Sequence, residues 1–348
     1  MIREVSIRNF KCYNEIAVGD LRPITIVVGE NGSGKTAFLE AVFLALGRSP
    51  ELVPRYRAQR GLEPNFSGSL RRIEEAIWKG LFFNGEWDRP LVIELEGDGP
   101  EARSVRVARG PAQLTIPLTG KAEGFEERAP ISFTWRDYIG REHVISPKLS
   151  RNSLELDSTN EEIPDFFFFP SSQFLSAAES ASRFSELSQQ NRLDGLVRAF
   201  TKEYRFISDL SIEVEGGSPI IFATLRDGGL KLPLANVSSG INRVVSILAA
   251  IAVSPSTVVI VDEIENGIYY KHLPSICRMM YSFAKQAGAQ LLLSTHSEEW
   301  LEALVIESDI PENDVCLLRV ERHNGHAMIQ HFPGDELRAG LEYGSKIR

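Results

Sequence analysis

The residues best suited to chemistry lie near the N-terminus, at positions 29–36. They read Gly-Glu-Asn-Gly-Ser-Gly-Lys-Thr and fit the pattern GxxxxGK(S/T). A β-rich apolar run, Ile24–Val28, precedes them, and an expected apolar helix, Ala37–Leu46, follows. In this context the glycines let backbone N–H groups surround phosphate oxygens, and the helix start adds partial positive charge. The other interpretation is a glycine-rich turn with a solvated lysine, which the flanking strand and helix disfavour.

This loop therefore predicts a nucleotide site with ATP and Mg²⁺ as cofactors. Lys35 should reach the β- and γ-phosphates, and the Thr36 hydroxyl should ligate Mg²⁺. The residues predicted to bind nucleotide here are Gly29, Glu30, Asn31, Gly32, Ser33, Gly34, Lys35, Thr36 and Ala37.

A second chemical feature is the acidic pair Asp262-Glu263, which follows four apolar residues, Val258–Val261. Such a run predicts a buried central strand, and ligands bind at the carboxyl ends of strands in α/β sheets. Asp262 is then placed to hold Mg²⁺ through water, and Glu263 to act as general base on the attacking water. A buried strand can also end in two exposed acids, but the phosphate loop favours the catalytic interpretation.

Two further segments extend the pattern. Ser238-Ser239-Gly240 opens a predicted helix upstream of Asp262, and Leu291–Ser297 carries a histidine, His296, after an apolar run. The first resembles a divergent signature motif of ABC ATPases, and the second resembles their switch-histidine loop. Taken singly, the serines also suit an ordinary helix N-cap and His296 suits the edge of a core. The four motifs stand in the order found in that family.

The resemblance implies a composite site. In ABC ATPases two heads pack head to tail, and the signature of each caps the γ-phosphate held by the other. It thus assigns Ser238, Ser239 and Gly240 to nucleotide binding in trans, and His296 to sensing the γ-phosphate in cis. We expect a homodimer or a higher homo-oligomer, with slow hydrolysis.

Within that class the chain looks like the OLD-like and RecF-like ATPases found in prokaryotic defence systems. Ile7–Lys11 resembles the strand and turn with which RecF-type and SMC-type heads begin, where a basic residue approaches the nucleotide. Lys11 is the candidate, and a solvated turn lysine is the alternative. Glu265-Asn266-Gly267 resembles the family's ENGLHP segment, although Ile268–Tyr270 departs from it and places any role of that His and Pro in doubt. The resemblance covers both ends well and residues 50–230 only in outline.

The glutamine loop of ABC proteins follows a strand in the middle of the chain. The apolar, aromatic segment Asp165–Phe169 is the expected strand, so Gln173 is the candidate for this loop and for a further Mg²⁺ contact. A plain surface glutamine is the alternative.

The elements that must position these residues predict an α/β fold of the P-loop NTPase class. We expect an ABC-type head with a mixed central sheet, an antiparallel β subdomain and a helical lobe carrying the signature. One such head should fill residues 1–348. Residues 1–48 and 236–348 should form the nucleotide-binding core, 83–156 an antiparallel β insertion, and 157–235 a helical and β lobe leading to the signature.

Composition sets the remaining bounds. The 348 residues are 43% hydrophobic and carry a formal net charge of −9, which argues against a surface that binds nucleic acid throughout. The scattered cysteines, Cys12, Cys277 and Cys316, suit a reducing cytoplasm, and the apolar runs are too short to span a bilayer. We therefore expect a cytoplasmic protein without a membrane partner.

The biological role has three interpretations. The missing effector domain suggests a sensor or regulatory ATPase of an anti-phage defence complex with a separate nuclease or toxin. The arginines at positions 55–72 suggest an alternative, a RecF-like protein that binds DNA, although a solvated helix face also explains them. A transporter subunit fits least, because the signature lacks the usual LSGGQ form.

Overall fold

The computed structural model describes residues 1–47, 49–50, 53, 70–110, 113–115, 126–128, 130–149, 154–155, 166–171, 177–255, 257–323 and 325–343. Its central feature is a six-stranded sheet. The strands lie in the order β12 (Phe166–Phe169), β16 (Val258–Val261), β17 (Gln290–Ser294), β3 (Ile24–Val28), β18 (Val315–His323) and β19 (His326–Pro333). Neighbouring strands run parallel except for β18 and β19, so the expected mixed sheet is confirmed.

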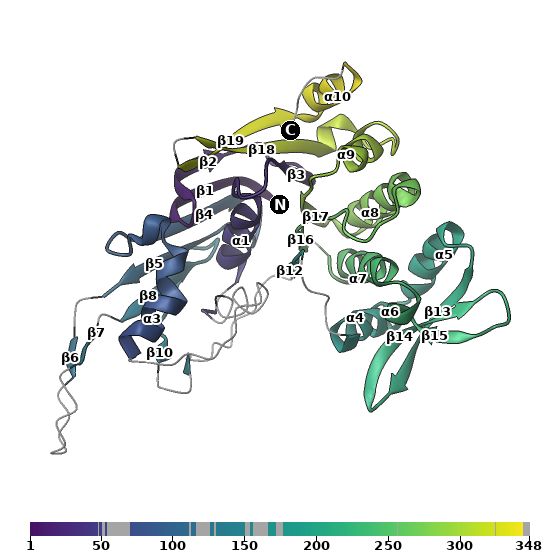
Figure 1. Ribbon diagram of the computed structural model, residues 1–348, viewed down its shortest axis with the longest axis horizontal. Coiled ribbons are helices and arrows are strands. Elements are labelled where there is room, and N and C mark those ends of the chain that lie inside the picture. The colour runs from purple at the N-terminus through teal and green to yellow at the C-terminus, as the bar shows by residue number, and fades with distance from the viewer. Residues whose placement is uncertain are drawn as a thin grey trace.

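The parallel strands are buried on both faces because their side chains alternate between two helical layers. On β16, Val259 and Val261 pack with the core of one face, while Val258 and Ile260 pack with the core of the other. The first face is covered by α7 (Ser239–Val253), α8 (Leu273–Ala287) and α9 (Glu298–Val305). The second is covered by α1 (Lys35–Leu46). Figure 1 shows α1 on the opposite side of the sheet from α7 and α8.

Helix α1 is buried on nearly all sides because a second sheet covers its other side. This antiparallel sheet has the order β2 (Tyr13–Val18), β1 (Ile2–Phe10), β4 (Leu91–Gly97), β5 (Arg103–Arg109), β8 (Ile131–Arg136) and β9 (Glu142–Ile145). Trp135 Nε1 donates to the carbonyl oxygen of Leu44 at 3.1 Å and ties this sheet to the helix. The antiparallel sheet extends beyond the expected 83–156 insertion, because β1 pairs with β4.

Smaller elements surround this sheet. They are α3 (Leu70–Trp78), the 3-10 turns η1 (Lys79–Leu81) and η2 (Phe83–Gly85), and the short hairpin pairs β6 (Gln113–Thr115) with β7 (Glu126–Arg128) and β10 (Lys148–Leu149) with β11 (Leu154–Glu155). The arginines that suggested DNA binding lie largely outside the described residues, at positions 55, 57 and 60.

The lobe before the signature combines helices with a small sheet. It contains α4 (Ala177–Gln189), α5 (Leu193–Glu203), β13 (Ile207–Glu215), β14 (Ser218–Leu225), β15 (Lys231–Pro233) and α6 (Leu234–Val237). Its apolar side chains join the same core as α7, and the hydroxyls of Ser180 and Ser246 meet at 3.0 Å between α4 and α7. The lobe is therefore packed against the helix that carries the signature.

Several elements were not expected from the sequence. They include the hairpin strand β2, the pair β18 and β19, the 3-10 turns η3 (Tyr270–His272) and η4 (Glu312–Asp314), and α10 (Gly334–Glu342). Strand β18 matters most for the site, because it pairs with β3 along Ile24–Val28 and so lies directly beside the strand that leads into the phosphate loop.

Among the described residues, no helix has the length and apolar character needed to cross a membrane.

Candidate active site

The predicted chemical residues gather at one edge of the parallel sheet. Strands β3, β16 and β17 run parallel, so their carboxyl ends bring the phosphate loop, Asp262 and Ser294 together. Helices α1 and α7 also begin at this edge, because α1 follows β3 and α7 leads back to the start of β16. Their N-termini share the edge but lie on opposite faces of the sheet.

The phosphate loop joins β3 to α1. Lys35 is buried, and its Nζ donates to the carbonyl oxygens of Gly29 and Glu30, each at 2.9 Å. Burial lowers the pKa of Lys35, and the nearby carboxylates oppose that shift. Gly29 has φ +141°, and a Cβ there would lie 2.2 Å from the carbonyl oxygen of Val320 on β18. Only glycine lets the loop approach β18 this closely.

Asp262 is only 2% exposed and is held on both carboxylate oxygens. The Thr36 hydroxyl donates to Oδ2 at 3.0 Å, and the Ser294 hydroxyl donates to Oδ1 at 2.5 Å. Burial raises the pKa of Asp262, and the two hydroxyls act in the opposite direction. The Thr36 hydroxyl and the Asp262 carboxylate are hard oxygen ligands, and they lie close enough to hold one ion. The donor set therefore fits Mg²⁺.

Glu263 differs from Asp262 in both exposure and backbone. Its side chain is 35% exposed, which leaves the carboxylate accessible to water. Its φ of +50° is a strained value for a non-glycine residue, and its backbone N–H donates to Ser294 Oγ at 2.8 Å. Asn266 Nδ2 donates to Glu263 Oε2 at 2.7 Å, while His296 Nε2 lies 4.0 Å from Oε1. The bond from Asn266 orients the Glu263 carboxylate, and water can reach it. Both properties suit a general base.

The segment from Glu263 to Gly267 links the acidic pair to the other motifs. Glu265 Oε1 accepts a hydrogen bond from the His296 backbone N–H at 2.6 Å. At the far end Gly267 presses on the signature, since a Cβ on Gly240 would lie 1.7 Å from the carbonyl oxygen of Gly267. The start of α7 and the segment that contains Glu263 are therefore in direct backbone contact.

Arg243, one turn into α7, makes a second connection. Its guanidinium donates to the carbonyl oxygens of Asp262 at 2.7 Å, Glu263 at 3.4 Å and Pro170 at 2.9 Å. The side chain is buried, and burial lowers its pKa. The signature helix is thus bonded to the backbone of the acidic pair.

The signature serines have distinct surroundings. Ser238 is the N-cap of α7, and its Oγ accepts from the Ile241 backbone N–H at 3.3 Å. Ser239 begins the helix and is exposed, whereas Gly240 is buried. An exposed hydroxyl at a helix N-terminus suits an anion supplied from outside the chain.

The remaining predicted residues fall in different places. Ala37 is buried in the first turn of α1, and Asn31 and Gly32 are exposed at the tip of the loop. Lys11 forms an ion pair with Glu40 of α1, and the neighbouring Tyr13 hydroxyl donates to the carbonyl oxygen of Gly34 at 3.0 Å. Lys11 thus stands beside the phosphate loop but is paired within the fold. Gln173 lies outside the described residues.

Three residues that contact the acidic pair were missed from the sequence: Ser294, Asn266 and Arg243. Ser294 ends a predicted strand at the carboxyl edge of the sheet, a position that marks it as a site residue. Asn266 and Arg243 carry no such positional signal. Asn266 reaches Glu263 across a local turn, and the contacts of Arg243 depend on how α7 packs against the acidic pair.

The fold and this site define an ABC-type P-loop ATPase of the OLD-like and RecF-like group. A family model described as "AAA domain, putative AbiEii toxin, Type IV TA system" matches residues 24–302, and the chain belongs to that family.

Relatives and solved structures agree with this class. The chain is 21% identical to an ATP/GTP phosphatase of Helicobacter pylori, over 98% of each chain. It is 24% identical to the DNA replication and repair protein RecF of Halalkalibacterium halodurans, over 45% of this chain and 37% of that protein. An SMC head bound to the C-terminal winged-helix domain of ScpA shares the fold, with a TM-score of 0.52, 12% identity, and 95% of this chain and 98% of that chain covered.

Proposed function

We propose that two copies of this chain bind and slowly hydrolyse ATP at composite sites, and that ATP binding closes the dimer while hydrolysis releases it. The observation that carries the proposal is the arrangement of Thr36, Asp262 and Glu263 around one sheet edge. Asp262 is buried and hydroxyl-bonded, while its neighbour Glu263 is exposed to water. Two adjacent carboxylates with such different surroundings suit two different roles.

In this mechanism the loop amides and Lys35 hold the phosphates. Lys35 would exchange its bonds to the carbonyl oxygens of Gly29 and Glu30 for phosphate oxygens. Mg²⁺, held by Thr36 and Asp262, would neutralise charge on the phosphate oxygens. Glu263 accepts the proton of the attacking water, whose oxygen forms the new bond to the γ-phosphorus as the bond to ADP breaks. His296 lies on the same side of the phosphate loop as Glu263 and would contact the γ-phosphate.

The position of the signature supports completion of the site by a second copy. Ser239 and the phosphate loop share one edge but stand on opposite faces of the sheet. A partner related by a two-fold axis can present its Ser239 and Gly240 to this loop, and this chain can present its own in return. ATP contacts both copies only in the closed state and therefore shifts the population towards it.

For the biological role, we propose a cytoplasmic regulatory ATPase of a multi-subunit defence complex whose effector, a nuclease or toxin, is a separate protein. The family description, which mentions a toxin and a Type IV toxin–antitoxin system, supports this proposal. The three free cysteines of the chain favour a reducing compartment.

A second candidate role is ATP-dependent DNA binding in repair. The similarity to RecF and to a segment of the yeast protein named structural maintenance of chromosomes protein 6 supports it. DNA affinity that depends on ATP and falls steeply with salt would favour this role.

The test is a pull-down with tagged Glu263→Gln protein in ATP, which should hold the closed state. Glu263→Gln combined with Lys35→Ala is the matched control, because it removes nucleotide binding from the same protein. A stoichiometric nuclease or toxin captured by the first protein and lost in the second supports the defence role. DNA with repair factors and no effector would overturn that role in favour of the RecF-like one.

A further inference from the structure

A hollow of about 390 Å³ lies on the other side of the phosphate loop from the carboxylates. We call it the β18 pocket. It is lined by Gly29, Glu30, Asn31, Gly32, Ser33, Arg319, Val320, Glu321 and Arg322. Its volume falls within the range of small-molecule sites, roughly 300–1,000 Å³.

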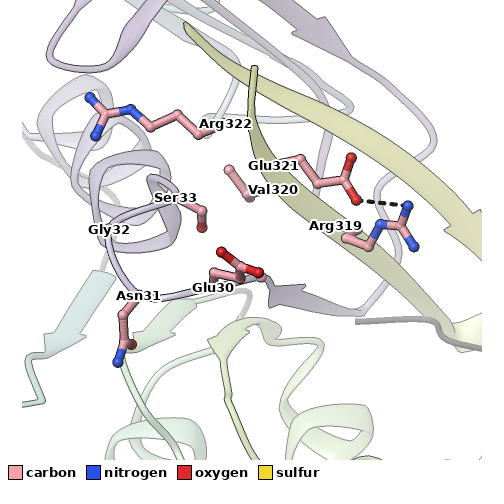
Figure 2. Close-up of a pocket in the computed structure, with 9 residues that line it drawn as sticks. Glu30, Asn31, Gly32, Ser33, Arg319, Val320, Glu321 and Arg322 are labelled. Atoms are coloured by element: carbon pink, nitrogen blue, oxygen red, sulfur yellow. Dashed lines mark ion pairs between the residues drawn. The ribbon is translucent and has the colours of Figure 1, made fainter. Parts of the chain in front are cut away.

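The pocket contains polar groups without an internal partner. Ser33 is only 3% exposed, yet its Oγ has no hydrogen-bond partner in the part of the chain that the structure describes. Figure 2 shows the Ser33 hydroxyl and the Glu30 carboxylate pointing into the space between the loop and β18. A buried hydroxyl left without a partner costs free energy, so a ligand that reaches it is favoured.

The two arginines of the pocket differ. Arg319 pairs with Glu321 at 2.8 Å, at one end of the pocket in Figure 2. Arg322 lies at the opposite end. Its side chain is exposed and makes no ion pair or hydrogen bond to any described residue. Its guanidinium is therefore available to a ligand.

The order of the strands fixes the direction of a bound nucleotide. Strand β3 lies between β17 and β18, and Asp262, Glu263 and His296 all follow strands on the β17 side. The γ-phosphate must face those residues for hydrolysis to occur. A triphosphate held by the loop then directs its other end, which carries the nucleoside, towards β18.

We propose that the β18 pocket binds the nucleoside half of the nucleotide, with Arg322 covering the base and Glu30 accepting hydrogen bonds from the ribose hydroxyls. This inference rests on the proposed ATP site and extends it to residues after β17. A guanidinium plane stacks on any purine face. Stacking contacts the face of a base and not its hydrogen-bonding edge, so we expect ATP and GTP to bind with similar affinity.

The first test separates nucleoside contacts from phosphate contacts. Binding of ATP, GTP and inorganic tripolyphosphate is measured by calorimetry on the full chain carrying Glu263→Gln, with and without Arg322→Ala. We expect Arg322→Ala to weaken ATP and GTP about tenfold and leave tripolyphosphate unchanged. Arg278→Ala is the matched control, because Arg278 is an exposed arginine whose guanidinium bonds the carbonyl oxygen of Glu307, away from this pocket.

Two outcomes would overturn the inference: unchanged ATP affinity, or an equal loss for ATP and tripolyphosphate, which would place Arg322 on the phosphates. A second pair of ligands tests Glu30 independently. Glu30→Gln should weaken ATP but not 2′,3′-dideoxy-ATP, and equal effects on both would remove the ribose contact from the proposal. The proposed ATP site itself is tested separately with Lys35→Ala. If this variant binds tripolyphosphate as tightly as the parent protein, the phosphate loop does not hold the phosphates and the ATP site is contradicted.

Discussion

The two sides of the phosphate loop are built differently. On the β17 side, both carboxylates of the acidic pair already accept hydrogen bonds, from Thr36 and Ser294 to Asp262 and from Asn266 to Glu263. On the β18 side, the hollow of about 390 Å³ contains a buried hydroxyl and an exposed guanidinium whose side chains have no internal partner among the described residues.

This difference corresponds to two tasks. A chemical step gains most from groups fixed before the reaction, because reorganising them would add to the barrier. A binding subsite gains most from volume and from polar groups that the ligand satisfies. Substitutions on the β17 side should therefore change kcat, and substitutions on the β18 side should change affinity.

The largest expected effect is that of Glu263→Gln, which removes the base and keeps the side-chain shape. We expect kcat to fall about 10²- to 10⁴-fold while ATP still binds. Phosphate release and ATP affinity measured on the same protein check this, with Glu302→Gln, an exposed acid of α9, as the control. Hydrolysis within a few fold of the parent rate would show that another group is the base.

A substitution at the contact between the signature and the Glu263–Gly267 segment should have the next largest effect. Gly240→Ala would bring a Cβ to 1.7 Å from the backbone oxygen of Gly267, so one of two backbone segments must move. We expect a loss of about 1–3 kcal/mol in the free energy of unfolding, measured by denaturant titration, together with reduced hydrolysis.

Gly195→Ala in α5 is the matched control, because a Cβ there meets open space and alanine favours a helix. It should leave stability unchanged or slightly raised. Equal stability of the two variants would show that the tight contact at Gly240 is relieved at no cost.

The smallest expected effect is that of Asn266→Ala, which removes the donor to Glu263 and leaves the base in place. As a positioning residue, Asn266 should change kcat by about threefold to tenfold, or ~1 kcal/mol, with KM unchanged. Steady-state kinetics on this variant and on Asn313→Ala, an exposed asparagine in η4, measure the difference. A rise in KM with constant kcat would instead place Asn266 in nucleotide binding.

Part of the fold could be predicted because its central strands are short apolar runs with clear ends. Val258–Val261 had to be a buried strand, and Asp262 then had to stand at the carboxyl edge. The run Ile24–Val28, predicted to precede the phosphate loop, is strand β3 with the same ends.

The rest depends on contacts between distant segments, which local patterns do not encode. No local sequence pattern around Arg319 and Arg322 shows that β18 pairs with β3 and lies beside the phosphate loop. Lys11 was a candidate for nucleotide contact through the resemblance to RecF-type heads, and its ion pair with Glu40 depends on how α1 packs against the turn after β1.

The central claim, that each site is shared between two copies, is tested most directly by mixing Lys35→Ala protein with Ser239→Arg protein. Each variant alone should be nearly inactive. One composite site in each mixed dimer keeps an intact loop and an intact signature, so an equal mixture should recover about one quarter of the parent activity if subunits exchange at random. A mixture of Lys35→Ala with Glu263→Gln should recover nothing, because both changes affect residues that act in the same subunit. No recovery in the first mixture, with both variants folded and associated, would contradict the shared site.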